Sequence, residues 1–535
     1  MTAGKLVTHN HRSECPAAAA PAAEGQQAAQ YHSEVNFNDI QGDIIAPFPK
    51  RVEDFIFFKI DRADRFRGAL TNLLPYITRA SNVLERREAI NRHKQEKQPG
   101  LVDVEFVNIA FTHSGLKALI GNEVDELGDN LFARGQLDHA KELGDRVKRV
   151  DEDGNHSWDP IDWRNEYKRS DVHGVLLVAS QSREHLNSIL DRIRDQVDEI
   201  YTLHGKTRPG SLKDHEHFGW KDGISNPFLR GVYHDCSRLP GQRIIDPGVI
   251  LVGNTGDNYP PSAGGGPRDR PGWAKNGSFM VFRELDQLVP EFHKFLWNNP
   301  VQLEIPGWSP ARLRRKGAEL RGAQFVGRWP NGKLLISCTP LQRNALEESL
   351  NIAENEREVN NFTFKLDDQT FCPFSAHIRK MNPRLDPSEV DGINFDLHSV
   401  VRTGIAYGEE LLTQEEHSHT RLHRGLAFVC YQSDIGEGFS FQQRAWANNP
   451  LFPPPFTGHP DKGLDPLIGQ RESRGSIVST TGIHQGGDQN DVRITTDNQG
   501  HEIVVHDFII PRGGAYFFVP SMSTLEKIAS AELAP

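Results

Sequence analysis

An aspartate in a short loop bounded by glycines is the first group in this sequence that is suited to catalysis. Asp222 lies in the run FGWKDGISNP (residues 218–227), between Gly219 and Gly223. Glycine reaches backbone angles that other residues avoid, so the two glycines can hold Asp222 in a fixed and unusual pose. A carboxylate held in this way suits a general acid/base. Asp-Gly is also a common turn, so the loop alone leaves a purely structural role open.

A histidine followed by cations is the second candidate. His377 comes after small and aromatic residues and is followed closely by three cations, Arg379, Lys380 and Arg384. A neutral imidazole can ligate iron through one nitrogen while its other nitrogen donates a hydrogen bond. The cations can pair with anionic groups such as haem propionates. The chain has 23 histidines, so His377 taken singly also fits a role without a metal.

An arginine in an apolar, strand-like stretch is the third candidate. Arg402 lies in the run VVRTGIAYG (residues 400–408). Burying an unpaired charge is costly, so Arg402 must either meet a carboxylate or line a polar cavity. Together, Asp222 and Arg402 would place one acid/base and one cation beside the same reactant.

Four segments share a pattern that predicts the elements carrying these residues. Each has a short apolar run, typical of a buried strand, followed by a turn and an amphipathic helix. Two such units fall in each half of the chain, which favours a duplicated α+β fold, with chance similarity as the alternative. The predicted strands and helices are 54–60 and 63–74, 174–179 and 183–197, 278–283 and 287–297, and 425–431 and 435–447.

The length and charge of the chain limit its organisation and partners. A chain of 535 residues is long for a single core, so we expect two domains. We place a disordered N-terminal extension at 1–35, a first domain carrying the Asp222 loop at 36–252 and a second domain at 253–535. The net charge of -11 argues against nucleic acid or an anionic membrane as the main partner.

Cysteine usage and hydropathy predict a reduced, cytoplasmic environment. Five scattered cysteines with no Cys-x-x-Cys-His motif argue against a disulfide framework and against covalently attached c-type haem. No stretch has the length of apolar sequence that a membrane helix needs, and no signal segment is visible. We therefore expect a cytoplasmic protein, with secretion by another route left open.

These residues and several further motifs together resemble the dye-decolorizing peroxidases, in particular their large, fungal-type branch. The central matches are the GWKDG loop with Asp222, the HIRKMNPR run with His377, and Arg402. Further matches follow in order along residues 37–523: NDIQGDI (38–44), VGRW (326–329), the segment 425–433, DPLIGQ (465–470) and RGGAYFFVP (512–520).

The resemblance implies a duplicated ferredoxin-like fold of two antiparallel sheets with peripheral helices, holding a non-covalent haem b in its C-terminal half. His377 would be the proximal ligand of the haem iron, with Asp465 accepting the other imidazole proton. Asp222 would be the distal acid/base and Arg402 its distal partner. Leu426 and Phe428 would line the distal pocket.

The implied activity is reduction of hydrogen peroxide coupled to oxidation of an organic donor, a dye or a phenolic, through an oxoferryl iron and a porphyrin radical. Asp222 would carry a proton between the peroxide oxygens while Arg402 stabilises developing charge. Bulky donors would be oxidised at surface aromatics, for which we expect Tyr407 and Trp446, with burial in the core as the alternative. Gly404 stands where some branches have a distal Asn. The protein would be a monomer or a homodimer.

Two other functions fit parts of the sequence. Neighbouring histidines suit a zinc metallohydrolase, although none forms a helical i, i+4 pair backed by a catalytic Glu; they are His215, His217, His417, His419 and His423. A non-enzymatic haem-binding or haem-handling protein would need His377 but neither Asp222 nor Arg402. The presence of all three therefore favours the enzyme.

Overall fold

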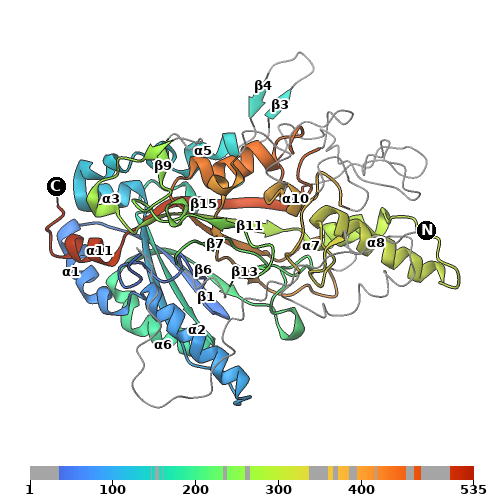
Figure 1. Ribbon diagram of the computed structural model, residues 1–535, viewed down its shortest axis with the longest axis horizontal. Coiled ribbons are helices and arrows are strands. Elements are labelled where there is room, and N and C mark those ends of the chain that lie inside the picture. The colour runs from blue at the N-terminus through green and yellow to red at the C-terminus, as the bar shows by residue number, and fades with distance from the viewer. Residues whose placement is uncertain are drawn as a thin grey trace, which may run out of the picture.

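Eight antiparallel strands close into a barrel at the centre of the molecule, with helices packed around it (Figure 1). The structure is a computed structural model, and it describes residues 35–145, 161–232, 238–259, 265–335, 359–364, 372–384, 394–415, 419–453, 463–470 and 507–534, with the backbone of 148–150 and 156–158. The barrel closes where the first strand of the C-terminal half pairs with a later strand of that half, and a short ninth strand is added at the edge.

Each half of the barrel is a four-stranded antiparallel unit with the same topology. The N-terminal unit runs β2-β5-β1-β6, built from β1 (Val52–Lys59), β2 (Glu105–Phe111), β5 (Gly174–Ser180) and β6 (Asp198–Lys206). The C-terminal unit runs β15-β11-β14-β13, built from β11 (Ser278–Gln287), β13 (Ile405–Gly408), β14 (Arg424–Gln432) and β15 (Ile509–Val519). In both units the first strand in sequence lies between two later strands of its own half, which is typical of the ferredoxin-like arrangement. The predicted duplicated fold is confirmed.

The two sheets are joined only at narrow seams. Among the described residues, β15 and β2 share the single register pair Phe518↔Phe111, and β13 and β6 share Tyr407↔Gly205. Within a half, by contrast, neighbouring strands pair over much of their length, as β1 and β5 do from Val52 to Phe58. The predicted two antiparallel sheets are confirmed, and they meet at both edges to form one barrel.

Most of the predicted helices follow their strands as expected. In the N-terminal half these are α1 (Ala63–Leu73) and α6 (Arg183–Ile193), and in the C-terminal half α7 (Val289–Asn298) follows β11. The fourth predicted helix is instead two π-helical turns, Gly436–Ser440 and Gln442–Ala447. Gly438 has non-helical angles there, and glycine is a poor helix former, which explains the irregularity.

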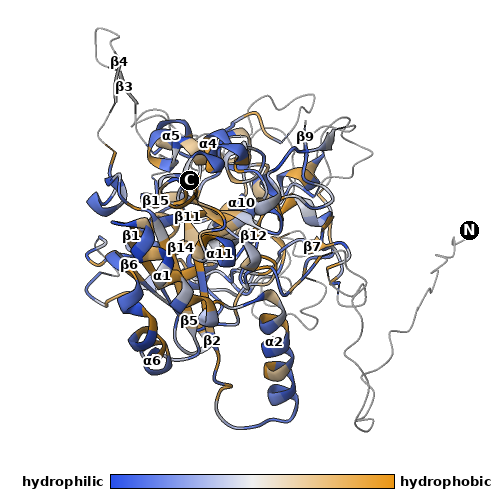
Figure 2. Cartoon of the chain, turned by 90° about the vertical axis from the view of Figure 1, so that its left-hand side faces the viewer, coloured by the Kyte–Doolittle hydropathy of each residue, from blue (hydrophilic) through white to orange (hydrophobic). Residues whose placement is uncertain are grey.

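Alternate residues of the strands serve two different hydrophobic layers. On β1, Phe55 and Phe57 belong to one buried cluster and Ile56 and Phe58 to another. This follows from the two-residue period of a strand, which sends successive side chains to opposite faces. Figure 2 shows the central strands as mostly hydrophobic and the outer helix α2 (Ala80–Gln95) as mostly hydrophilic.

The remaining elements surround this core. α11 (Met522–Ala529) packs against α1, and α8 (Pro310–Val326) lies beside α7 (Figure 1). Three helices of the N-terminal half contact β15 of the C-terminal half: α3 (His113–Ile120), α4 (Asn130–Arg134) and α5 (Gln136–Leu143). Two-stranded pairs form between β3 (Lys148–Val150) and β4 (His156–Trp158), β7 (Phe228–Leu229) and β8 (Ile244–Ile245), and β9 (Asn258–Tyr259) and β10 (Gly266–Pro267). In the described part of the chain, no helix has the length and apolarity needed to cross a membrane.

The predicted domain limits stay predictions. The proposed extension at 1–35 falls almost entirely outside the described residues, which begin at Val35. The boundary between 252 and 253 falls between β8 and β11, in the connection that leads from one half of the barrel to the other.

Candidate active site

The Asp222 loop has the backbone conformation that its glycines predict. Gly219 has a φ of 103° and Gly223 a φ of 68°, both in the left-handed region that favours glycine. Two backbone hydrogen bonds hold the residues between these glycines in place. Asp222 N donates to Asp214 O at 2.9 Å, and Lys221 N donates to Pro330 O at 3.0 Å. The carboxylate of Asp222 is therefore presented by a shaped loop.

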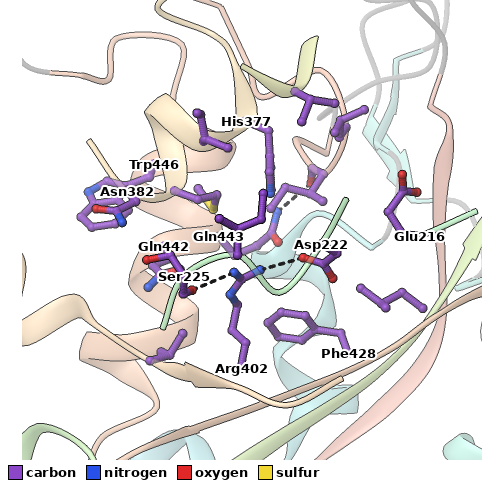
Figure 3. A pocket seen from close by; sticks show the side chains of 18 of the residues that line it. Glu216, Asp222, Ser225, His377, Asn382, Arg402, Phe428, Gln442, Gln443 and Trp446 are labelled. Carbon is purple, nitrogen blue, oxygen red and sulfur yellow. Dashed lines mark hydrogen bonds and ion pairs between the residues drawn. The ribbon is translucent and has the colours of Figure 1, made fainter. Parts of the chain in front are cut away.

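Arg402 meets Asp222 across the two halves of the chain. Arg402 lies on the short edge strand β12 (Val401–Arg402), which pairs with β14. Its Nη1 lies 3.5 Å from Oδ1 of Asp222, and its Nη2 donates to Ser225 O at 3.2 Å (Figure 3). Both side chains are more than a third exposed, at 38% for Arg402 and 40% for Asp222. Both groups are therefore open to a molecule in the space beside them.

His377 is oriented by a buried carboxylate. It is the first residue of the short helix α10 (His377–Met381), and its Nδ1 donates to Oδ2 of Asp465 at 2.8 Å. The other oxygen, Oδ1 of Asp465, accepts from the backbone N–H groups of Leu467 and Ile468 at 2.8 and 3.1 Å. The hydrogen bond from His377 to Asp465 fixes the imidazole ring and leaves its Nε2 available as a metal ligand.

One cavity of about 290 Å³ brings the predicted residues together. Asp222, His377, Arg402, Leu426 and Phe428 all line it. In Figure 3, His377 enters from one side, and Asp222, Arg402 and Phe428 lie on the other. Leu426 and Phe428 share one face of β14 because they are two residues apart. The fold therefore gathers these five residues around one space, while the role of each stays a prediction.

Strand register builds one wall of the cavity. On β11, Arg283 lies opposite Phe428 and Leu285 opposite Leu426, and all four line the cavity. Arg283 is buried and pairs with Asp145 at 2.7 Å, but its Nε and Nη1 have no hydrogen-bond partner within the described residues. Buried donors without partners are uncommon in proteins, so this wall suits a bound group that carries acceptors.

Two further arginines line the cavity, and neither forms an ion pair with a carboxylate of the described residues. Arg328 and Arg384 both donate to Oδ1 of Asn360, at 2.9 and 3.1 Å, and both lie over the ring of Phe362. Burial, together with a smaller effect of neighbouring cations, lowers the pKa of each guanidinium to about 10. A bound anion would relieve that repulsion.

Arg379, predicted as a propionate partner, lies elsewhere. Its side chain is buried, its Nη1 donates to Cys372 O at 2.7 Å, and its guanidinium lies over the rings of Phe364 and Phe374. Arg379 does not line the cavity, whereas Arg384 does. Among the described residues, these contacts hold Arg379 away from the cavity wall, so the propionate role predicted for it is not supported.

Neither aromatic predicted for the surface is exposed. Tyr407 is 3% exposed, and its hydroxyl donates to Asp286 at 2.6 Å inside the barrel. Trp446 is also 3% exposed and stacks on Phe452 with ring centroids 5.2 Å apart. The prediction of surface aromatics is wrong for both residues, because each side chain faces a core. Trp446 nevertheless lines the cavity.

The sequence reasoning gave no site role to several residues of the cavity wall. Glu216 accepts from the N–H groups of Phe218 and Trp220, at 2.7 and 2.8 Å, and so shapes the Asp222 loop. Asn226 bonds the backbone of Arg402. Glu216 and Asn226 lie close in sequence to Asp222, and Arg328 lies in the VGRW match. Their proximity to these motifs is the feature of the sequence that could have indicated a place in the site.

Among the described residues, the histidines of the alternative zinc site do not form a metal-binding group. No group of three or more metal-binding side chains occurs among the residues that the structure describes. His217 contacts the carbonyl of Tyr407 at 2.9 Å, and His423 pairs with Asp286 at 2.9 Å. His417 lies outside the described residues. These two histidines therefore have separate partners.

A histidine oriented by a carboxylate can ligate haem iron, and here it shares one cavity with an acid and a guanidinium that could act on a bound oxidant. The comparisons agree. The family model of the DyP dimeric alpha+beta barrel domain matches residues 39–209. The dye-decolorizing peroxidase msp1 of Mycetinis scorodonius is 38% identical over an alignment of 526 residues that covers 95% of this chain and 91% of that protein.

Solved structures give the same result over nearly the whole chain. An ancestral D-type dye decolorizing peroxidase has a TM-score of 0.77 at 40% identity, covering 92% of this chain and 99% of that one. A dye-decolorizing peroxidase in complex with 2,6-dimethoxyphenol has a TM-score of 0.72 at 35% identity, covering 92% of this chain and 100% of that one. The chain therefore belongs to the dye-decolorizing peroxidase family, in its fungal-type branch, and is a haem-dependent peroxidase.

Proposed function

We propose that the cavity holds a non-covalent haem b with His377 as its proximal ligand. The observation that carries this proposal is that His377, held by Asp465, lines the same cavity as Asp222 and Arg402. The sequence has no Cys-x-x-Cys-His motif for covalent attachment. Asp465 would keep the imidazole oriented and more basic, as carboxylate partners of metal-bound histidines do.

The cations of the cavity wall support the same cofactor. Haem b carries two propionates, and the buried Arg328 and the partly buried Arg384 place two cations at the cavity wall. We keep Arg384 as a predicted propionate partner and propose Arg328 in place of Arg379. The N–H groups of Arg283 that have no partner in the described part of the chain offer a further contact for an anionic or acceptor group.

Asp222 and Arg402 would act on hydrogen peroxide. When bound, haem iron supplies the electrons that reduce peroxide to water. The Asp222 carboxylate takes the proton from one peroxide oxygen and returns it to the other oxygen, which leaves as water. The Arg402 guanidinium stabilises the negative charge that develops as the O–O bond breaks. Leu426 and Phe428 keep this side of the cavity apolar and limit the water in it.

We propose dyes and phenolics as the organic donors. A solved relative binds 2,6-dimethoxyphenol, and relatives carry the name dye-decolorizing peroxidase. Bulky donors need a route for electrons through the protein, and of the two aromatics predicted for it only Trp446 lines the cavity. A monomer or homodimer and a cytoplasmic location stay predictions.

Reconstitution with haem tests this function directly. The purified chain is titrated with haemin, and a Soret band is expected at one haem per chain, followed by peroxide-dependent bleaching of an anthraquinone dye. His377→Ala should weaken or abolish haem binding. Absence of a Soret band would overturn the proposal. A Soret band without peroxide turnover would favour a haem-handling protein instead.

A further inference from the structure

The ion pair between Asp222 and Arg402 is too weak to position its own members. The two side chains come from different halves of the chain, and their charged atoms lie 3.5 Å apart with each side chain more than a third exposed. Exposed ion pairs at such distances contribute little to stability and hold no fixed geometry. Another contact must therefore set where Arg402 lies relative to the Asp222 loop.

Asn226 makes that contact with both ends of its side-chain amide. Its Nδ2 donates to Arg402 O at 3.0 Å, and its Oδ1 accepts from Arg402 N at 2.9 Å. This is the two-bond pattern by which one residue of an antiparallel strand pairs with its neighbour. Because β12 is the edge strand of the sheet, Asn226 occupies the position of a missing strand partner.

The segment that carries Asn226 also holds the guanidinium of Arg402. Ser225 O accepts from Nη2 of Arg402 at 3.2 Å, so neighbouring residues fix the backbone and the side chain of the same arginine. Gln242 Nε2 donates to Asn226 O at 3.0 Å and anchors the segment through its backbone. The Asp222 loop and Arg402 are thereby docked as one unit.

We infer that Asn226 is a positioning residue for peroxide cleavage, fixing the separation of Asp222 and Arg402. This inference rests on the proposed function of that pair. Asn226 acts through Arg402, so its effect should depend on the presence of the arginine. A bidentate backbone clamp has directional requirements that a carboxylate in its place cannot meet, because Asp lacks the Nδ2 donor.

Rapid mixing of the haem-loaded protein with hydrogen peroxide measures this effect. Asn226→Ala should lower the second-order rate constant by about tenfold to a hundredfold, the range expected when a catalytic group moves by about 1 Å. Asn226→Asp should give a loss of similar size, because one of its carboxylate oxygens would face the carbonyl oxygen of Arg402, to which Asn226 Nδ2 donates in the wild type. Asn254→Ala is the matched control, because Asn254 is a partly buried loop residue with two side-chain hydrogen bonds and does not line the cavity.

A double-mutant cycle separates positioning from a general structural role. In an Arg402→Ala background, Asn226→Ala should change the rate constant less than about twofold, because the group it positions is gone. Equal losses in both backgrounds, or a wild-type rate in Asn226→Ala, would overturn the inference. If Asn226→Ala does not fold, Asn226→Asp is compared with wild type in the same cycle.

A structure of the variant tests the inference independently of activity. In crystals of Asn226→Ala, the distance from Arg402 Nη1 to Asp222 Oδ1 should increase from 3.5 Å. An unchanged distance would refute the positioning role even if wild type failed to react with peroxide. Failure of wild type alone would instead overturn the proposed function.

Discussion

Glu216 accepts two backbone hydrogen bonds that help to shape the Asp222 loop, and it should make stability depend on pH. Burial raises the pKa of Glu216 from 4.5 to about 7, although hydrogen bonds from the loop and from Gln287 oppose the shift and the nearby Asp222 adds to it. At a pH between these two pKa values, Glu216 is protonated in the folded chain and ionised in the unfolded chain. The contribution of Glu216 to stability therefore falls as pH rises through this window.

Glu216→Gln should remove this dependence, because an amide does not titrate. The difference in free energy of unfolding between the variant and wild type should therefore change in favour of the variant by about 1–3 kcal/mol as the pH rises from about 4.5 to about 7.5. This range follows from about 1.4 kcal/mol per unit of pKa shift. Urea unfolding across this range measures it, with Glu88→Gln on the exposed side of α2 as the control. Parallel curves for wild type and Glu216→Gln would contradict the raised pKa.

At the same scale, residues with distinctive chemistry were predictable and residues defined by their surroundings were not. Asp222, His377 and Arg402 stand in motifs, and the fold brings them to one cavity. Tyr407 and Trp446 were predicted at the surface, yet exposure depends on what packs against an aromatic ring. Asn226 was missed because an asparagine that pairs with a distant backbone looks the same in sequence as one in any turn.

At the scale of the element, the loop that carries Asp222 should resist any side chain at Gly223. Gly223 has a φ of 68°, and nothing lies within 4 Å of the place that a methyl group would take, so Gly223→Ala introduces backbone strain without a clash. We expect a loss of about 1–2 kcal/mol in the free energy of unfolding.

Gly68→Ala gives the opposite expectation at a similarly open position. Gly68 lies within α1 and also has nothing within 4 Å, so alanine there should stabilise the chain by about 0.5–1 kcal/mol. Chemical denaturation of both variants measures the difference. Equal effects of the two substitutions would show that the conformation of the Asp222 loop does not require glycine.

The periodic elements were the most predictable part of the fold. The strand predicted at 278–283 lies within β11, and the helix predicted at 183–197 begins with α6 at Arg183. Side chains that face the core recur every two residues in a strand and every 3.6 residues in a helix. This spacing of hydrophobic residues can be recognised in a single sequence. The π-helical turns after β14 were not foreseen, since they depend on the local conformation of Gly438.

At the scale of the whole molecule, the seams between the halves should limit stability. Gln41 links the two halves beside the seam between β2 and β15. Its Nε2 donates to Ile109 O at 3.0 Å and to Pro520 O at 2.8 Å, and its Oε1 accepts from Ile109 N at 2.9 Å. Closure of the barrel could not be read from the sequence, because both seams join residues far apart in the chain through few pairs.

Gln41→Leu should therefore destabilise the chain by about 2–4 kcal/mol, because it leaves buried backbone groups without partners. A lower urea midpoint is expected, whereas the exposed Gln98→Leu should leave the midpoint nearly unchanged. An unchanged midpoint for Gln41→Leu would mean that the seam is held by other contacts.

The central claim is that Asp222 moves the proton in peroxide cleavage, and Asp222→Asn tests it most directly. Asparagine keeps the shape and removes the base, so the haem-loaded variant should retain its Soret band while its rate constant with hydrogen peroxide falls by about 10²–10⁴-fold. Asp214→Asn, an exposed carboxylate beside the same loop, should react at the wild-type rate. A wild-type rate in Asp222→Asn would contradict the claim and leave Arg402 as the only group assisting O–O cleavage.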